Sequence, residues 1–414
     1  MAAGASNMVK AEKFRLAAAQ SGVDLAGSRY LPRLGFEEAF VASNSPTQTF
    51  MMKLDEGRLA ANDLQVANLN NPGTQQDFRT ALVLTQPLYD PAIAPAREIA
   101  VKQAESRSMN LETTRQEAAF TAFQLYLVIQ KSKARVRAAE TALGESRENL
   151  RLAKVRTGSG VGLKSDELRA RTHLASIEQI LVTERNMLTL ARMQLEKLLG
   201  FKDGETLEAE DAVFVMPPSP GQNDLIAIAL ESRSDLRQVR IEQEKANAEV
   251  RQARSGYLPS VGAFASYQLN SKDTPFGAEN DSWLAGVTLK WQIFDGFARD
   301  SDYRRAIANR SASGEYLDSQ MKEVVYSVKE SLLKHDEARK RLEVARSSLQ
   351  DAEEAVRLIA RRYENSLATM YELLDAQTVL NRARAELIDN ETNLALAGGQ
   401  IFRAAGIFLK EMSK

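Results

Sequence analysis

Few residues of this 414-residue chain have the type and spacing that bond chemistry requires. The two histidines, His173 and His335, lie far apart on separate predicted helices without a nucleophile motif, and His335 occupies a heptad core position, which favours a packed or hydrogen-bonded role. Residues 158–162 are rich in glycine, but they follow a helix and lack the Lys-Ser/Thr end of a phosphate-binding loop. Met51 and Met52 alone are weak evidence for a soft metal. The sequence therefore predicts no catalytic residue, no cofactor and no metal site, and an enzyme is the least supported functional class.

The charge balance argues against nucleic acid as a partner. The 54 basic and 55 acidic residues give a formal net charge of -1, whereas phosphate binding needs an excess of Lys and Arg on one face. The chain has no cysteine, which rules out a disulfide framework and fits an oxidising compartment such as the periplasm. The sequence has no apolar run long enough for a transmembrane helix and no visible signal peptide, so an exported form is expected to have lost its leader.

The chain is built from two similar halves. Residues 28–35 (Ser-Arg-Tyr-Leu-Pro-Arg-Leu-Gly) recur as residues 255–262, and residues 84–90 recur as residues 289–295. Each half reads as helix, strand, loop or turn, strand, very long helix, tight turn and returning helix. The second half opens with an apolar helical start at 224–230 that the first half lacks, so we expect the first helical turns to be missing together with the leader.

Two heptad rows run along each predicted long helix, one of mostly large residues and one of mostly small residues. In the second half the large row is Val328, His335, Leu342, Leu349 and Val356, and the small row is Val324, Ser331, Ala338, Ala345, Ala352 and Ile359. The first half repeats them as Ala122, Ile129, Val136, Leu143 and Leu150, with Ala118, Leu125, Ser132, Ala139, Ser146 and Ala153. Small residues let helices approach closely, so the pattern predicts coiled-coil packing and favours a ring over a two-stranded rod.

The predicted helix lengths indicate an extended column. Residues 92–156 would form a helix of roughly 65 residues, or about 98 Å. The returning helix at 166–200 is about half as long, and the helix at 224–254 supplies the other half. Between them, 201–222 carries Pro-Pro-Ser-Pro-Gly, which breaks the column. These lengths predict a tall cylinder with a belt at mid-height.

Four strands are predicted at 30–43, 78–90, 257–270 and 282–295. The last strand alternates apolar and polar residues, and both tryptophans of the chain fall on its apolar side. The second strand repeats this alternation less strongly. The residues predicted to face lipid are Phe78, Leu82, Leu84, Trp283, Val287, Leu289, Trp291 and Ile293. From the strand pattern alone, a half-buried strand in a soluble sandwich remains an equal alternative.

The number of predicted strands favours a membrane barrel built from several copies over a soluble sandwich. Four strands cannot close a pore, and an open apolar sheet in lipid would leave its edges unpaired. Three copies would supply twelve strands and a closed barrel. Prolines lie at the predicted junctions between helices and strands, where the backbone changes direction. The long loop 44–77 and the shorter loop 271–281 would then lie on the same outer side.

The doubled layout, the paired Tyr-Leu-Pro segments and Gln-Pro-Leu-Tyr-Asp at 86–90 resemble the TolC family of outer-membrane efflux proteins over nearly the whole chain. The resemblance implies a homotrimer in the outer membrane of a Gram-negative cell that extends into the periplasm. It implies a β-barrel continuous with an α-helical tunnel, which docks through a periplasmic adaptor, or membrane fusion protein, to an inner-membrane pump. The channel itself would conduct substrates passively, and outer-membrane lipid would surround the barrel.

The resemblance also assigns working parts to the two hairpin turns. The first turn resembles the tip that meets the adaptor, and we expect Ser165 or Asp166 to cap the helix that follows it. The predicted adaptor-contact residues are Val161, Gly162, Leu163, Ser165, Asp166, Leu367, Ala368 and Thr369. The alternative is that they only form turns and caps.

Glu372 and Asp375 match the acidic positions that ring the periplasmic mouth in this family, so three copies would place six carboxylates in a narrow aperture. The sequence departs from the family pattern with Glu at 372, where Asp is common, and with Ser366 in place of the usual Gly. The alternative is that the two acids are merely solvated.

Together these inferences predict a mainly α fold with a small β part. Long antiparallel coiled-coil hairpins and four β-strands per chain would form, in the trimer, a 12-stranded β-barrel continuous with an α-helical barrel. The predicted segments are an N-terminal helix at 1–29, a strand pair at 30–90, a helical hairpin at 91–200, an equatorial segment at 201–222, a helix at 223–256, a second strand pair at 257–295 and a second hairpin at 296–414.

The favoured function is the outer-membrane channel of a tripartite efflux or type I secretion system. A soluble coiled-coil scaffold or adaptor is the alternative from another class. It would explain the heptad rows, but it leaves unexplained the alternation from Trp283 to Ile293 and the paired Tyr-Leu-Pro segments.

Overall fold

The structure, a computed structural model, describes residues 6–201 and 221–412. The chain divides into two compact units. Residues 1–16, 106–240 and 316–414 form the helical unit, and residues 17–105 and 241–315 form the unit that contains the sheet. In each half the elements follow one another in the order that the sequence predicts.

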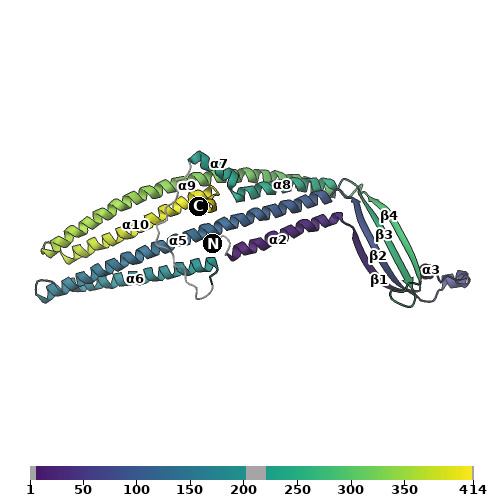
Figure 1. The fold of residues 1–414 in the computed structure, drawn as a ribbon, viewed down its shortest axis with the longest axis horizontal. Coiled ribbons are helices and arrows are strands. Elements are labelled where there is room, and N and C mark those ends of the chain that lie inside the picture. The colour runs from purple at the N-terminus through teal and green to yellow at the C-terminus, as the bar shows by residue number, and fades with distance from the viewer. Residues whose placement is uncertain (1–5, 202–220, 413–414) are drawn as a thin grey trace. The chain divides into compact units, whose positions relative to one another are not determined.

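Two long helical hairpins dominate the helical unit. Helix α5 (Ile93–Gly158) is followed by the returning helix α6 (Lys164–Leu199), and α9 (Ala298–Glu364) is followed by α10 (Met370–Ala404) (Figure 1). Both long helices begin in the sheet-containing unit. Outside the loop between the first two strands, the other α-helices among the described residues are α2 (Asn7–Gly27), α7 (Gln222–Ser232), α8 (Ser234–Ser255) and α11 (Phe408–Met412).

The predicted heptad rows form the buried side of the long helices. Ile129 and Val328 have no exposed surface, and every other member of both rows is buried or half-buried, including His335. Ile129 packs against Ala191 and Leu195 of α6, and burial of one such side chain contributes about 1.5–3 kcal/mol. The heptad pattern therefore predicted the packed face of each hairpin correctly.

The predicted helix at 224–254 is two helices, because the chain bends at Arg233. This residue has an extended backbone (φ -65°, ψ 121°) and ends α7. Its guanidinium is held on three sides: by the Asp235 carboxylate at 2.6 Å, the Ser327 hydroxyl at 2.8 Å and the Ala404 carbonyl at 3.3 Å. Contacts with α9 and α10 thus fix a bend that local sequence does not signal. Most of the predicted equatorial segment, residues 202–220, lies outside the described residues.

The sheet has four antiparallel strands in the order β1-β2-β3-β4. They are β1 (Arg33–Ser43), β2 (Gln75–Tyr89), β3 (Ser260–Ser271) and β4 (Asn280–Lys290). Strands β1 and β4 are the edges, since each pairs with one neighbour within the described chain. The connected order matches the expected pairing of two similar halves.

Three predicted strands, 30–43, 257–270 and 282–295, are too long at the end that connects to a helix; β3, for example, begins at Ser260. Residues 28–30 form a short 3-10 helix, and Pro32 immediately precedes β1. Strand β4 stops at Lys290, five residues before the predicted end at 295. Arg299 explains this stop, because its guanidinium donates to the backbone carbonyls of Gln292 and Ile293 at 2.5 and 2.6 Å. These carbonyls serve the junction with α9 rather than a strand ladder.

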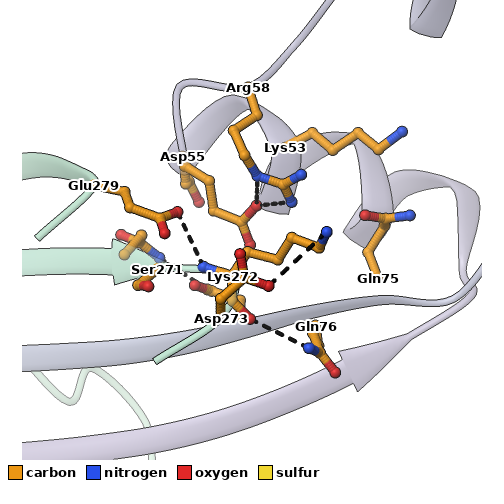
Figure 2. A network of polar contacts seen from close by, with 12 residues as sticks. Lys53, Asp55, Arg58, Gln75, Gln76, Ser271, Lys272, Asp273 and Glu279 are labelled. Atoms are coloured by element: carbon orange, nitrogen blue, oxygen red, sulfur yellow. Dashed lines mark hydrogen bonds and ion pairs between the residues drawn. The ribbon is translucent and has the colours of Figure 1, made fainter. Parts of the chain in front are cut away.

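The predicted loop 44–77 contains three short helices: α3 (Pro46–Asp55), a 3-10 helix (Ala61–Leu64) and α4 (Val66–Asn70). It meets the β3–β4 turn, as predicted from strand order. The Asn280 amide donates to the Asp55 carbonyl at 2.7 Å, and the Gln76 amide donates to the Lys272 carbonyl at 3.3 Å (Figure 2). The Glu56 carboxylate is buried here and paired with Arg58, and burial raises its pKa. Both loops therefore lie at one end of the sheet.

Ile129→Ala should destabilise the helical unit by about 2–5 kcal/mol, because it opens a cavity in a fully buried seam position. The matched control is Val128→Ala on the preceding, 42% exposed position, which should change stability by no more than about 0.5 kcal/mol. Thermal unfolding in detergent, followed by circular dichroism, measures both. Equal shifts in the two variants would show that the seam does not bury Ile129.

Candidate functional site

One side of the sheet carries a mainly apolar surface, which is interrupted by Glu38, whose carboxylate accepts from the Thr80 hydroxyl at 2.5 Å. The strand register aligns Phe36 with Leu82 and aligns Tyr267 with Trp283. Trp283 is 77% exposed within the chain and Leu82 is 45% exposed. A large apolar patch open on a single chain marks an interaction with lipid or with another protein. We call this surface the apolar face; it comprises Leu34, Phe36, Phe40, Phe78, Leu82, Leu84, Tyr267, Trp283, Val287 and Leu289.

Strand β1 contributes three large apolar residues to this face that were not predicted to face lipid. Leu34, Phe36 and Phe40 share one parity along β1, so a signal was present in the sequence, although Glu38 interrupts the alternation. Phe78 is only half-buried, because its ring packs on Phe40 with centroids 4.8 Å apart.

Two residues predicted to face lipid lie beyond the end of β4. Trp291 and Ile293 are 57% and 78% exposed, and the Trp291 indole donates to the Tyr257 carbonyl at 3.2 Å.

No helix among residues 6–201 and 221–412 has the length and apolarity needed to span a membrane.

The opposite side of the sheet carries charged side chains, together with apolar residues such as Val83, Phe264 and Leu284. Arg33, Glu37, Asp77, Arg79 and Lys290 all point to this side, since they alternate with members of the apolar face along each strand. Asp77 is fully buried and receives a hydrogen bond from the Asn270 amide at 2.8 Å. We call this side the polar face.

The first hairpin turn depends on two glycines. Gly160 has φ +77°, a conformation that other residues adopt only with strain, and a Cβ on Gly162 would lie 2.8 Å from the Cβ of Arg156. This tight path projects Val161 and Leu163 into solvent, where they are 71% and 67% exposed. The turn thus presents two bare apolar side chains.

The predicted cap of α6 is wrong. Helix α6 begins at Lys164, so Ser165 and Asp166 lie within its first turn, and the residue at the cap position is Leu163, which makes no side-chain cap hydrogen bond. Asp166 still places a negative charge at the helix N-terminus, where the helix dipole favours it.

The second turn contains a true cap. Thr369 precedes α10 and accepts a hydrogen bond from the Glu372 backbone, while the Glu372 carboxylate accepts from the backbone and hydroxyl of Thr369 at 2.6 and 2.9 Å. Ser366, in place of glycine, has φ +61°. Leu367 is 68% exposed and Ala368 is half-buried.

The structure brings the two turns together through residues that sequence reasoning missed. The Arg156 guanidinium lies 4.5 Å from the Tyr363 ring centroid and donates to the Tyr363 carbonyl and the Ser366 hydroxyl, each at 2.8 Å. Tyr363 also packs with Ala153 and Met370 in a buried cluster that joins both hairpins. Tyr363 continues the heptad row of Val356 by one repeat, so this one signal could have been found.

The two predicted mouth carboxylates differ in their surroundings. Both Glu372 and Asp375 are exposed. The hydrogen bonds from Thr369 lower the pKa of Glu372, so that it stays ionised further into acid. Asp375 has no hydrogen-bond or ion-pair partner among residues 6–201 and 221–412. Glu372 therefore has a structural role in the helix cap in addition to its charge.

A polar seam joins α5 of the first hairpin to α10 of the second. Asp389 accepts from Arg135 at 2.7 Å and from Lys131 at 3.0 Å. Further along, the Asn149 amide donates to the buried Gln377 side chain at 2.6 Å. No local pattern marks these pairs, because their members lie hundreds of residues apart.

The part of the chain that the structure describes holds no group of three His, Cys, Asp or Glu residues arranged for a metal ion. His173 is hydrogen-bonded to the Ser146 hydroxyl at 3.1 Å, and burial lowers its pKa. These contacts fit a packed histidine.

A four-stranded sheet with one apolar face, continued in the same chain by two long helical hairpins, defines the class of outer-membrane channel subunits. The chain belongs to the outer membrane efflux protein family, whose sequence pattern matches residues 1–201 and 225–406. The family resemblance predicted from the sequence is thereby confirmed.

Individual relatives agree with this assignment. The outer membrane protein OprJ of Pseudomonas aeruginosa is 25% identical over 211 residues, a match that spans 48% of this chain and 44% of OprJ. The outer membrane protein TolC of Escherichia coli is 23% identical over 347 residues, or 79% of this chain and 69% of TolC. The crystal structure of the Campylobacter jejuni CmeC outer membrane channel superposes with a TM-score of 0.81 at 16% identity, covering 98% of this chain and 84% of CmeC. This last similarity establishes a shared fold.

Thr369→Ala should destabilise the start of α10 by about 1 kcal/mol, because it removes the cap hydrogen bonds. Hydrogen exchange over residues 370–380 at pH 7 would measure the loss. The control is Thr378→Ala on the same helix, whose hydroxyl bonds only to the Leu374 carbonyl one turn back; we expect it to be nearly neutral.

The cap should also depend on pH. A carboxyl whose folded pKa is lowered stabilises the fold above its unfolded pKa, and this stabilisation is lost as the pH falls through the folded pKa. For Glu372 that window lies below its ordinary value of 4.5. The difference between Thr369→Ala and the parent should therefore shrink below that pH, and a difference that stays constant would exclude Glu372 as the partner.

Proposed function

We propose that three copies of this chain form an outer-membrane channel that passively conducts substrates from the periplasm to the exterior. The observation that carries the proposal is the apolar face, with Trp283 77% exposed and Leu289 64% exposed. The same chain supplies the long helical hairpins that would continue the duct into the periplasm. Membership of the outer membrane efflux protein family supports this function.

The edges of the sheet support a trimer. Strands β1 and β4 leave unpaired backbone groups, and each such group costs several kcal/mol in lipid. Three copies joined from β4 to β1 would pair every edge in a closed barrel of twelve strands, an even number within the range of bacterial outer-membrane barrels. The apolar face would then contact outer-membrane lipid, and the polar face would line the lumen.

The hairpin turns fit a docking role toward a periplasmic adaptor. Val161, Leu163 and Leu367 expose apolar side chains at the two turns, and Arg156 ties those turns together. The adaptor would connect the channel to an inner-membrane pump in a tripartite efflux or type I secretion system. The pump would supply the energy, so the channel needs no bond chemistry and no cofactor.

A soluble coiled-coil scaffold is the rival function, and the apolar face argues against it. In water a scaffold would have to leave this face exposed or cover it with a partner. Purification separates the two functions, because a barrel subunit needs detergent or lipid to remain a monodisperse trimer. A trimer or monomer that stays monodisperse after detergent removal would favour the scaffold.

Planar-bilayer recording of the purified protein should show discrete, cation-preferring openings. The double variant Glu372→Gln/Asp375→Asn should lower the cation preference, because six carboxylates at the mouth would be neutralised. Glutamine can still accept the Thr369 hydrogen bond, so the substitution at 372 preserves the helix cap. The reversal potential in a salt gradient measures this change.

The control for this experiment is Glu353→Gln, which neutralises an exposed acid on α9 away from the second turn. Openings with unchanged ion preference in the double variant would keep the channel and remove the two acids from the mouth. Failure of well-folded protein to insert would contradict the channel itself.

Leu367→Asp should abolish export in cells that carry the cognate adaptor and pump, because it puts a charge on an apolar docking side chain. The measurement is drug susceptibility of a strain that lacks its own channel and expresses the variant. Leu367→Met, which keeps an apolar side chain of similar volume, should retain export.

Assembly of the Leu367→Asp variant must be confirmed by trimer migration on a native gel, because only an assembled variant tests docking. Full export by such trimers would remove Leu367 from the adaptor contact. Loss of export with Leu367→Met as well would point to turn geometry instead of apolar contact.

A further inference from the structure

A cavity of about 530 Å³ opens on the polar face where the strands continue into helices. Its lining contains three basic residues, Arg29, Arg33 and Lys290, and one acidic residue, Asp90. All of these residues belong to the sheet-containing unit. We call this cavity the basic pocket.

The three cations of the basic pocket are not neutralised. Arg29, Arg33 and Lys290 are exposed, and none has an ion pair or side-chain hydrogen bond within residues 6–201 and 221–412. The Asp90 carboxylate is engaged locally, because it accepts from the Ala92 backbone at 2.9 Å at the start of α5. The pocket therefore carries a net positive charge.

The far end of the polar face contrasts with this arrangement. There Arg79 lies 3.4 Å from the buried Asp77 carboxylate, so its charge is balanced. Most other cations of the sheet and its loops are also paired, as Arg58 is with Glu56 and Lys53 is with Asp63. Unbalanced positive charge is thus concentrated at the helix-connected end.

The strand register places hydrogen-bonding groups between the cations. Arg33 pairs across the strands with Thr85, and Lys290 pairs with Ser260. Thr288 pairs with Gly262, which adds no side chain to the pocket floor. Hydroxyl donors flanked by a guanidinium and an ammonium are the groups that bind oxyanions.

Trimer closure would concentrate the charge further, and this step rests on the proposed function. Arg33 lies on the edge strand β1 and Lys290 on the edge strand β4, three strand spacings, or about 14 Å, apart across the sheet. They are also offset by four residues along the strands, because the register places Arg33 level with Gly286. When β4 of one copy lies beside β1 of the next, the two edges meet. Each boundary between copies would then bring Lys290 of one chain toward Arg29 and Arg33 of another.

We infer that the basic pocket binds the carboxylate, phosphate or sulfonate groups of anions in the lumen of the barrel, at its helix-connected end. A ring of arginines and lysines raises the local concentration of anions and favours their passage. The acidic mouth at Glu372 and Asp375 would favour cations, so the duct would carry opposite charges at two levels. Anionic substrates would gain attraction after they pass the mouth.

Pyrophosphate tests this site in planar bilayers. Added at millimolar concentration, it should block open channels of the parent protein, and Arg33→Gln/Lys290→Gln should weaken this block by about tenfold, as expected for the loss of two exposed charge contacts. The charge-conserving variant Arg33→Lys/Lys290→Arg should retain the block. Lys272→Gln/Arg304→Gln removes the same net charge outside the pocket and is the matched control.

The outcomes separate this inference from the proposed function. Block of equal strength in the parent and in Arg33→Gln/Lys290→Gln, or an equal loss in the matched control, would overturn the basic pocket while leaving the channel intact. If the parent forms no channel, the proposed function fails, and calorimetric titration of pyrophosphate into the detergent-solubilised protein still decides. Heat of binding that disappears only with Arg33→Gln/Lys290→Gln supports the site, and no binding to the parent overturns it.

Discussion

Backbone hydrogen bonding at the two edges of the sheet is the constraint on which the rest of the structure depends. A single chain pairs the inner sides of β1 and β4 and leaves their outer sides open. An apolar face as exposed as that of Trp283 and Leu289 belongs in lipid, where open edges are too costly to persist. In the proposed trimer the sheet is therefore one third of a barrel that only further copies complete. In that trimer the small heptad row would serve the same end, because closely spaced helices can continue a closed ring of strands.

The two similar halves of the chain use the same residue type, an aspartate, where a strand continues into a long helix. Asp90 accepts from the Ala92 backbone, and Asp295, its counterpart in the second half, accepts from the Arg299 backbone at 3.2 Å. Each carboxylate satisfies a backbone group that the starting helix leaves free. The second junction adds the Arg299 side chain, which holds the carbonyls after β4. The two junctions therefore share the carboxylate but not the backbone path, because Gly296 and Phe297 adopt positive φ in the second junction and residues 91–92 do not in the first.

Periodicity explains which parts of this fold the sequence predicted. The heptad rows predict that Ile129 is buried, and the alternation along the strand predicts that Trp283 is exposed on its apolar side. Both patterns depend only on residues a few positions apart. The bend at Arg233 was missed because it involves contacts with Ser327 and Ala404, far along the chain. The end of β4 was missed because the contacts of Arg299 with Gln292 and Ile293 leave no periodic pattern in the sequence. The Asn149–Gln377 pair was likewise invisible, although it joins the two hairpins. The expected cap at Ser165 or Asp166 failed for a local reason: α6 begins at Lys164, which leaves both residues inside the first turn.

The helix cap changes how the acidic mouth should be understood. Both hydrogen bonds from Thr369 reach the same Glu372 oxygen, Oε2, so Oε1 keeps its lone pairs for solvent or passing cations. The cap fixes the position of the carboxylate and also lowers its pKa, which extends its ionised range below the ordinary value of 4.5. Asp375 lacks such an anchor and is free to reorient. Glu372 can therefore be solvent-exposed and still act at the proposed mouth. The hydrogen bonds from Thr369 order the turn, and they also hold the negative charge of Glu372 where the proposed mouth requires it.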